Sequence, residues 1–532
     1  MRITGSGDIV RTRVIEGEDR VERTRRELLR DGSRTAAGLA VAGVLAPGGP
    51  LGIAEAPAAS PKKRPGFNLG FKSLKAETYL PDLEVEGRLP RWLTGTLLRN
   101  GPALFEIGEE SFNHWFDGLA MLHAFAFTGG RVSYRNRFLR SSAYTAWKRE
   151  GRIKYSELAT DPAPDPCRQI FSGVSSLPVL GRVPNANVSI ERLAGRFRAH
   201  TEIPIPVRFN PKFLKTLGVG GDSMQGRLGT AHPHFDPATG ERFSYEVELV
   251  PPSGLRIVSE RRGKRRELAF IPQASPGYLH SFGLTRRYVV VVTQPWNFNL
   301  AKFLGPDRGP IITNYEWHPE LPSQVILVDR VRGGVAATIE TDPFFAFHHI
   351  NAYDRGGKVV IDVCAHEDAG VIEALYLKRI RRENKVPQAR YRRLEADPSS
   401  GKMTQRDLIE AVFELPQKNY DAVNARPYRY AYGVGLKGRG SGFIDQLVKA
   451  DVKRGESKIW RERGVYPGEP VFVPRPGARR EDDGVVLSVV LDGIRRRSGL
   501  VVLDARSMEE IARAEVPHHI PFGFHGLYTD RP

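Results

Sequence analysis

The sequence predicts an all-β protein organised as one large domain. From about residue 71 to the end of the chain, short runs of β-branched and apolar residues alternate with turn residues. Glycine occurs 54 times and proline 39 times in the 532 residues, which favours many turns and short strands over long helices. A sandwich, a barrel and a propeller all satisfy these observations.

The clearest predicted strands are rich in valine, isoleucine and leucine, and they lie at 288–293, 325–329, 358–363, 484–491 and 499–504. Turn sequences at 236–240, 355–357 and 397–401 separate strands of this kind. Helices are expected only around 445–453 and 373–382. No sequence repeat is visible, so periodicity alone does not indicate a propeller.

The chain is strongly basic, with a formal net charge of +18 and a pI of about 9.8. Its basic runs at 261–266, 377–384 and 494–497 fall in predicted loops, without a zinc finger, an RNA-binding motif or a basic helix. We therefore expect solvated loops and no nucleic-acid partner, with contact to anionic lipid as the alternative. The two cysteines, Cys167 and Cys364, form no CxxC pair and exclude a disulfide framework.

Residues 1–58 differ in composition from the rest of the chain. A basic stretch with Arg25 and Arg26 precedes an apolar run at 35–46 and a small-residue site near Ala58. The apolar run is too short to span a bilayer core of about 30 Å. The order is typical of an export signal, and the paired arginines resemble the twin-arginine type, which carries folded proteins. We expect 1–58 to be this signal and 59–532 to be an exported domain; a disordered tail on a cytoplasmic protein is the alternative.

Four histidines lie in four separate patterned segments: His232, His280, His348 and His525. No two neighbours among them are closer than 48 residues, so only the tertiary fold can bring them together. Four neutral imidazoles would suit a catalytic first-row metal such as Fe(II), whereas a lone histidine is usually a packed or solvated residue. Spacing alone leaves both interpretations open.

Three glutamates lie in apolar or proline-bounded surroundings, where a surface glutamate is less expected: Glu202, Glu414 and Glu469. Histidines that bind a metal usually donate their second ring N–H to an acceptor, which orients the ring. Buried glutamates would also balance the charge of an all-histidine site. Each glutamate taken alone is more often a surface residue than part of a metal site.

Seven separated motifs resemble, in order, those of the carotenoid cleavage oxygenase family: RNGP at 99–102, WFDG at 115–118 with LH at 122–123, TAHPH at 230–234, HSFG at 280–283, FHHIN at 347–351, EDDGVV at 481–486 and FHG at 524–526. The resemblance implies a seven-bladed β-propeller under a dome of helices and loops, with non-haem Fe(II) on the axis. It implies iron ligation by His232, His280, His348 and His525, with Glu202, Glu414 and Glu469 behind them. His234 and His349 match positions beside ligands.

Segments at 134–138, 164–171 and 413–420 are most similar to the animal-type branch, which includes β-carotene central-cleavage enzymes and a retinoid isomerase. The resemblance implies an oxygenase that uses O2 to cleave one C=C bond of an apolar polyene, with β-carotene cleavage to retinal favoured. Stilbene cleavage, ester isomerisation and a non-catalytic binding propeller are the alternatives. The segments at 209–214 and 296–304 mix aromatic residues with lysine, which is typical either of a membrane-surface patch or of ordinary core.

Overall fold

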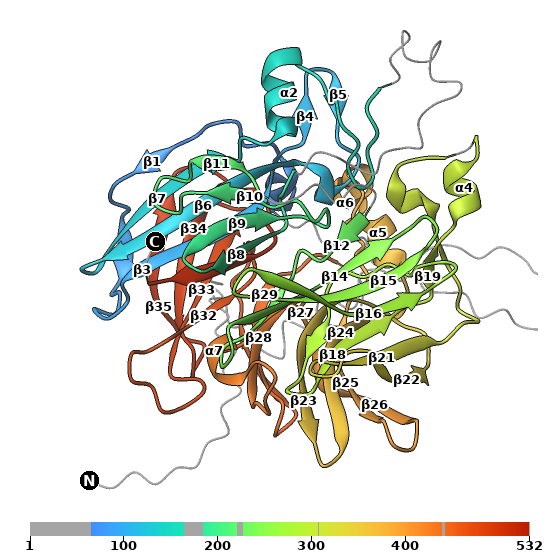
Figure 1. Cartoon of the computed structure of the whole chain (residues 1–532). Coiled ribbons are helices and arrows are strands. Elements are labelled where there is room, and N and C mark those ends of the chain that lie inside the picture. The colour runs from blue at the N-terminus through green and yellow to red at the C-terminus, as the bar shows by residue number, and fades with distance from the viewer. Residues whose placement is uncertain (1–64, 164–184, 221–226, 307, 439–441, 531–532) are drawn as a thin grey trace, which may run out of the picture.

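The computed structural model describes residues 65–163, 185–220, 227–306, 308–438 and 442–530. These residues form seven antiparallel sheets arranged as the blades of one propeller, together with two two-stranded sheets outside the blades (Figure 1). The predicted export signal and the boundary at residue 58 lie outside the described residues, as does Cys167, so these remain predictions. Among the described residues, no helix is long and apolar enough to cross a membrane.

The first three blades come from the N-terminal half of the chain and, for one strand, from its end. Blade 1 contains β1 (Tyr79–Leu80), β7 (Arg131–Phe138), β6 (Leu119–Thr128), β3 (Gly95–Leu104) and β36 (Gly526–Thr529). Blade 2 contains β8 (Ser189–Leu193), β9 (Arg196–His200), β10 (Val207–Phe209) and β11 (Thr216–Val219). Blade 3 contains β12 (Arg227–Gly229), β13 (His234–Asp236), β14 (Glu241–Glu248), β15 (Gly254–Arg261) and β16 (Lys264–Pro272).

The remaining four blades follow in chain order. Blade 4 contains β17 (Gly283–Leu284), β18 (Tyr288–Thr293), β21 (Ser323–Asp329) and β22 (Val335–Thr341). Blade 5 contains β23 (Phe345–Arg355), β24 (Lys358–His366), β25 (Arg390–Asp397) and β26 (Lys402–Val412). Blade 6 contains β27 (Glu414–Gln417), β28 (Tyr430–Gly435), β29 (Gln446–Asp451) and β30 (Glu456–Trp460). Blade 7 contains β31 (Val465–Pro467), β32 (Val471–Pro474), β33 (Gly484–Asp492), β34 (Arg497–Asp504), β35 (Glu510–Val516) and β2 (Val85–Gly87).

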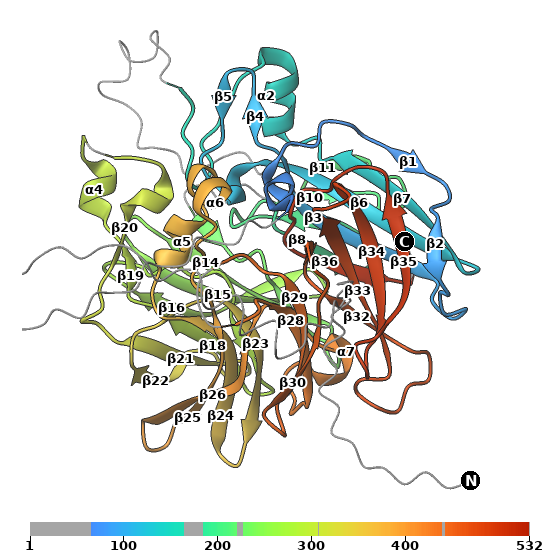
Figure 2. The same cartoon turned by 180° about the vertical axis from the view of Figure 1, so that it is seen from behind.

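The ring closes by strand exchange between the two ends of the chain. The C-terminal β36 pairs with β3 in blade 1, and the N-terminal β2 pairs with β35 in blade 7. The red C-terminal strands accordingly lie beside the blue N-terminal strands (Figure 2). Backbone hydrogen bonds therefore tie both ends of the described chain into the ring.

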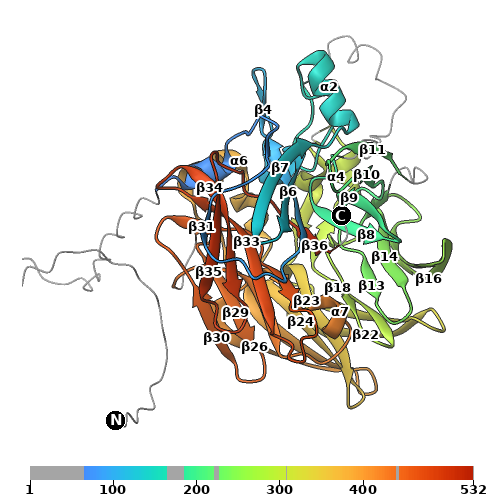
Figure 3. The same cartoon turned by 90° about the vertical axis from the view of Figure 1, so that its left-hand side faces the viewer.

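Short helices and loops connect the blades on one side and form the dome, seen at the top of Figure 3 around α2 and β4. The helices of the dome are η2 (Phe67–Phe71), η3 (Trp115–Asp117), α2 (Ser142–Glu150), α4 (Leu300–Leu304), η4 (Ile311–Asn314), α5 (Gly370–Ala374) and α6 (Leu377–Glu383). The dome also contains four short strands: β4 (Glu106–Ile107), β5 (Glu110–Ser111), β19 (Trp296–Phe298) and β20 (Tyr315–Trp317). One further helix, α7 (Tyr420–Val423), follows β27 in blade 6.

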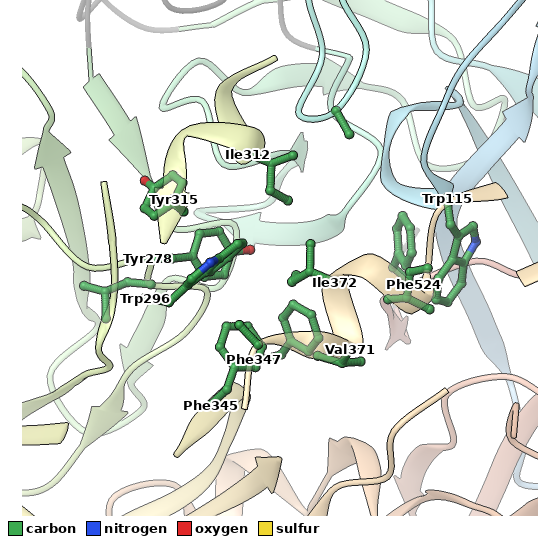
Figure 4. Packing of buried hydrophobic residues seen from close by; sticks show 14 of the residues in the cluster. Trp115, Tyr278, Trp296, Ile312, Tyr315, Phe345, Phe347, Val371, Ile372 and Phe524 are labelled. Atoms are coloured by element: carbon green, nitrogen blue, oxygen red, sulfur yellow. The ribbon is translucent and has the colours of Figure 1, made fainter. Parts of the chain in front are cut away.

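Apolar side chains fill the spaces between neighbouring blades, as expected where sheets pack face to face. One cluster joins blades 4 and 5, another joins blades 5 and 6, and a third joins blades 6 and 7. A larger, aromatic-rich cluster lies under the dome, where Trp115, Phe347 and Phe524 contribute rings (Figure 4). Cys364 is a free, buried thiol within the cluster between blades 5 and 6.

The all-β prediction is confirmed, and all five predicted strands are present as β18, β21, β24, β33 and β34. The helix expected at 373–382 is confirmed as α5 and α6. The helix expected at 445–453 is wrong, because this segment is β29, buried on both faces between blades. A strand buried on both faces loses the alternation that distinguishes it from a buried helix. The basic run at 377–384 was expected in a loop and instead forms α6.

Candidate metal centre

The four histidines meet at the inner ends of four blades. His232 precedes β13 in blade 3, His280 precedes β17 in blade 4, His348 lies in β23 of blade 5, and His525 precedes β36 in blade 1. One ring nitrogen from each lies within 4.8 Å of the corresponding nitrogen of every other. The innermost strand of each blade faces the axis, so a residue at its end projects into the shared central space.

Local backbone features aim these side chains. The pairing of β23 with β24 shifts register on both sides of His349, and such a bulge re-aims neighbouring side chains. The hydroxyl of Thr230 accepts the backbone N–H of His232 at 2.8 Å, which holds the turn before β13. His525 is followed by Gly526, whose position leaves no room for a Cβ beside the backbone of Leu98.

The two histidines adjacent to the cluster are engaged elsewhere. His234 lies 2.9 Å from the Tyr420 hydroxyl through Nδ1 and 2.9 Å from the Phe282 carbonyl through Nε2. The Nδ1 of His349 lies 3.0 Å from the Ser281 hydroxyl. Neither residue belongs to the group of converging nitrogens.

Each of the three predicted glutamates accepts a hydrogen bond from one clustered histidine. The Nδ1 of His280 lies 2.7 Å from Glu202, that of His348 lies 2.6 Å from Glu414, and that of His525 lies 2.7 Å from Glu469. Burial would raise the pKa of Glu469, but Arg99 and His525 outweigh it and hold the pKa at about 2. The pKa of Glu414 is likewise lowered, because His348 outweighs the effect of burial. Ionised carboxylates only accept, so the Nδ1 atoms carry the protons.

This protonation pattern leaves a lone pair on the Nε2 atoms of His280, His348 and His525. The Nε2 atoms of His232 and His280 are 3.0 Å apart, and those of His348 and His525 are 3.2 Å apart. Burial and the neighbouring imidazoles lower the pKa of His232, and burial lowers the pKa of His525 to about 4, so protonation does not relieve the repulsion between lone pairs. A cation bound between the Nε2 atoms would relieve this repulsion. Nitrogen ligands at right angles around a metal at about 2.1 Å are roughly 3 Å apart, so the residues fit a bound metal ion.

A cavity of about 520 Å3 leads to this cluster from under the dome. His280, His348 and His525 form part of its wall. Aromatic rings surround them: the Phe347 ring lies 5.5 Å from that of His280, and the Phe116 ring lies 5.4 Å from that of Phe524. The cavity therefore joins a group of metal-binding character to an apolar, aromatic chamber.

Three residues of this site are not singled out by sequence reasoning. Tyr278 donates to Glu202 at 2.6 Å, His366 lies 3.3 Å from Glu414, and Arg99 forms an ion pair with Glu469. Arg99 belongs to the RNGP motif, which was a usable signal. Tyr278 is two residues from His280, whereas nothing in the local sequence marks His366.

A seven-bladed propeller in which four histidines converge beside an aromatic cavity is the arrangement expected of a metal-dependent enzyme. The chain belongs to the retinal pigment epithelial membrane protein family, whose sequence profile matches residues 71–530. It is 35% identical to the mitochondrial carotenoid-cleaving dioxygenase of Macaca fascicularis over 508 residues, covering 84% of this chain and 91% of the relative. It is 32% identical to human β,β-carotene 15,15'-dioxygenase over 512 residues, covering 84% of this chain and 91% of the relative.

Solved structures of similar fold include those of Synechocystis apocarotenoid oxygenase. The cobalt-substituted form of that protein matches with a TM-score of 0.76 and 27% identity, covering 87% of this chain and 98% of the other. A chimera of that oxygenase with the retinal pigment epithelial protein matches with a TM-score of 0.77 and 28% identity, covering 87% and 98%. These matches agree with the seven-bladed architecture and with the motifs that indicate the family.

Proposed function

We propose that the protein is an Fe(II)-dependent dioxygenase that cleaves a conjugated C=C bond of a carotenoid or apocarotenoid with O2. The observation that carries this proposal is the convergence of four histidine ring nitrogens beside an aromatic cavity. The names of the relatives support the same reaction class. His232, His280, His348 and His525 would hold the iron, and Glu202, Glu414 and Glu469 would orient three of the four rings.

The bound iron would supply the activation of O2, which apolar side chains cannot provide. The protein would position the substrate and exclude water from the site. Phe116, Phe347 and Phe524 present ring faces and edges beside the histidines, and a flat polyene can pack against such rings. The three glutamates accept the Nδ1 protons of His280, His348 and His525, so these three rings keep their Nε2 lone pairs directed inward.

We infer β-carotene, cleaved centrally to retinal, as the favoured substrate. The double bonds of a polyene are chemically alike, so the depth to which the cavity admits one end of the molecule selects the bond. The 32% identity to a 15,15'-dioxygenase supports this choice.

The test is incubation of the iron-loaded protein with β-carotene, an apocarotenal, a retinyl ester and resveratrol under 18O2, followed by mass spectrometry of the products. We expect aldehyde products labelled with 18O from β-carotene or the apocarotenal. Products from the retinyl ester or from resveratrol alone would replace the proposal with isomerisation or stilbene cleavage. The His280→Ala variant should lose iron and activity, whereas the matched His318→Ala variant, altered at a surface histidine, should keep both.

We also propose contact with an anionic membrane surface, through which a water-insoluble polyene can enter. In the two segments with aromatic residues and lysine, part of the apolar side chains belongs to the core: Phe209, Leu214, Trp296 and Phe303 are buried. Exposed apolar side chains nevertheless remain in and beside the outer strands of blade 2, where Phe213, Leu217 and Val219 are each about half exposed. Lys212 and Lys215, also exposed, flank Phe213. This combination favours a basic, interfacial patch.

A further inference from the structure

The three glutamates behind the histidines have chemically different outer partners. Glu202 accepts the Tyr278 hydroxyl at 2.6 Å, and Glu414 faces Nε2 of His366 at 3.3 Å. Only Glu469 pairs with a permanently charged side chain, Arg99. Among the described residues, the ion pairs of Glu202 and Glu414 are with histidines and none is with lysine or arginine.

The Arg99 side chain is buried, and both of its terminal nitrogens donate hydrogen bonds. Its side chain is 7% exposed and that of Glu469 is fully buried. Nη1 donates to Oε2 of Glu469, and Nη2 donates to the carbonyl of Phe524 at 2.7 Å. Phe524 is the residue before His525. One guanidinium therefore holds both the carboxylate that accepts from His525 and the backbone next to His525.

Glu469 uses all of its acceptor capacity within this arrangement. Oε1 accepts from His525 at 2.7 Å and from Gln417 at 2.9 Å. Oε2 accepts from Arg99 and from the backbone N–H of Gly526 at 2.9 Å. Four donors fix the carboxylate in one orientation, which a surface ion pair cannot do.

The backbone around the guanidinium is shaped for it. Arg99 in β3 pairs directly with Gly526 in β36. A Cβ at position 526 would lie 2.7 Å from Cδ of Arg99 and 3.0 Å from Nη1. The RNGP and FHG motifs therefore meet in space, with the glycine of one making room for the arginine of the other.

The charges of these groups balance for a divalent ion. The three carboxylates contribute three negative charges, and Arg99 and a divalent metal contribute three positive ones. His366 faces Glu414 through Nε2, and its Nδ1 is buried without a hydrogen-bond partner in the part of the chain that the structure describes. Without Arg99 the buried group would hold one excess negative charge, which favours a trivalent over a divalent ion.

We propose that Arg99 is a positioning residue of the metal centre, which neutralises the three carboxylates against a divalent ion and holds Glu469 against His525. This inference rests on the proposed binding of iron by the four histidines. Arg99 acts through Glu469 and touches neither the metal ligands' rings nor the cavity. Its role is thus electrostatic and orienting.

The experiment is the Fe(III)/Fe(II) reduction potential of the iron-loaded protein, measured by spectroelectrochemistry. Arg99→Gln should lower the ferrous-to-ferric ratio at a set potential at least tenfold, a fall of about 59 mV for one electron. Glu469→Gln should shift the potential upward. The double variant restores the net charge, so its potential should return toward that of the unaltered protein although the ion pair is lost.

Arg393→Met is the matched control, because Arg393 forms an equally enclosed ion pair with Asp362 in blade 5. It should reduce stability and leave the potential unchanged. The inference is overturned if Arg99→Gln binds iron with an unaltered reduction potential. It is also overturned if the potential of the double variant differs from that of the unaltered protein by more than that of either single variant. If Arg99→Gln does not fold, Arg99→Lys tests the same point, since it keeps the charge and should keep the potential. Failure of the unaltered protein to bind iron would refute the proposed function instead.

Discussion

Identical side chains a residue or two apart have different roles in this protein, and their neighbours decide which. His232 directs Nε2 toward three other imidazoles, whereas both ring nitrogens of His234 are bonded to Tyr420 and Phe282. His348 and His349 differ because successive residues of a strand face opposite sides. Nε2 of His348 faces His525, whereas Nδ1 of His349 lies beside the Ser281 hydroxyl and its Nε2 is buried without a hydrogen-bond partner among the described residues. A ligand histidine is therefore identified by the direction of its ring nitrogen toward the other imidazoles, and not by an unbonded nitrogen alone.

Buried neutral histidines make the stability of the protein sensitive to acid, and His114 shows the effect outside the metal centre. Its Nδ1 accepts the N–H of Phe116 at 3.1 Å, and its Nε2 faces the carbonyl of Ile372 at 3.0 Å. Both contacts are satisfied only by the neutral ring. Burial lowers its pKa to about 4, against a weaker opposing effect of the Ile372 carbonyl.

Between pH 6.5 and about pH 4 the unfolded chain binds a proton at residue 114 that the folded chain does not. The free energy of unfolding should therefore fall as the pH falls through this window, by at most about 3 kcal/mol for this residue. In His114→Gln, urea unfolding measured at intervals from pH 7 to pH 4 should show a shallower decline. The same decline as in the unaltered protein would contradict this prediction, and His318→Gln, at the surface, serves as its control.

At the scale of elements, the joint between β3 and β36 connects ring closure with the metal centre. Gly526 pairs with Arg99 across this joint and donates its N–H to Glu469. A Cβ on Gly526 would lie 2.2 Å from the carbonyl oxygen of Leu98, which is backbone and cannot rotate away. Any side chain here must push β36 away from β3.

Gly526→Ala should lower the free energy of unfolding by about 2 kcal/mol, the usual cost of overpacking. It should also weaken metal retention, because His525 moves with the strand. Chemical denaturation and metal content after dialysis against a chelator measure the two effects. Gly220→Ala is the control, since a Cβ there would make only ordinary contact with Arg208. Equal stability of the two variants would show that the joint tolerates a side chain.

At the scale of the whole molecule, the net charge of +18 and the exposed apolar residues of blade 2 have one combined consequence. Positive charge attracts the protein to anionic bilayers over a distance limited by salt screening, and apolar side chains then insert at the interface. Neither property alone gives stable attachment, because a diffuse charge is easily screened and three side chains bury little area.

We expect the protein to sediment with vesicles of mixed phosphatidylcholine and phosphatidylserine, and less so as the salt concentration rises. The double variant Phe213→Ser with Leu217→Ser should sediment several-fold less. Val331→Ser, which removes a 75% exposed valine from blade 4, should behave as the unaltered protein does. Sedimentation equal to that of the unaltered protein in both variants would assign the contact to charge alone, and an equal loss in both would contradict a contact centred on blade 2.

The all-β class could be predicted from the sequence, because strand-forming runs and turn residues are local properties of the chain. The sequence also singled out the four histidines and three glutamates, through motifs that resemble a known family. It misjudged 445–453, since β29 is buried on both faces and its pattern does not alternate. It also left Tyr278, His366 and Arg99 without roles.

Which of these groups come into contact depends on the three-dimensional fold. Ring closure places Arg99 of β3 beside Glu469 of blade 7 and His525 at the end of the chain, 370 and 426 residues away along the sequence. Contacts at such separations depend on how seven blades pack around one axis, and no local pattern encodes that packing. The charge on the metal centre is therefore a property of the closed ring, although each residue that carries it is visible in the sequence.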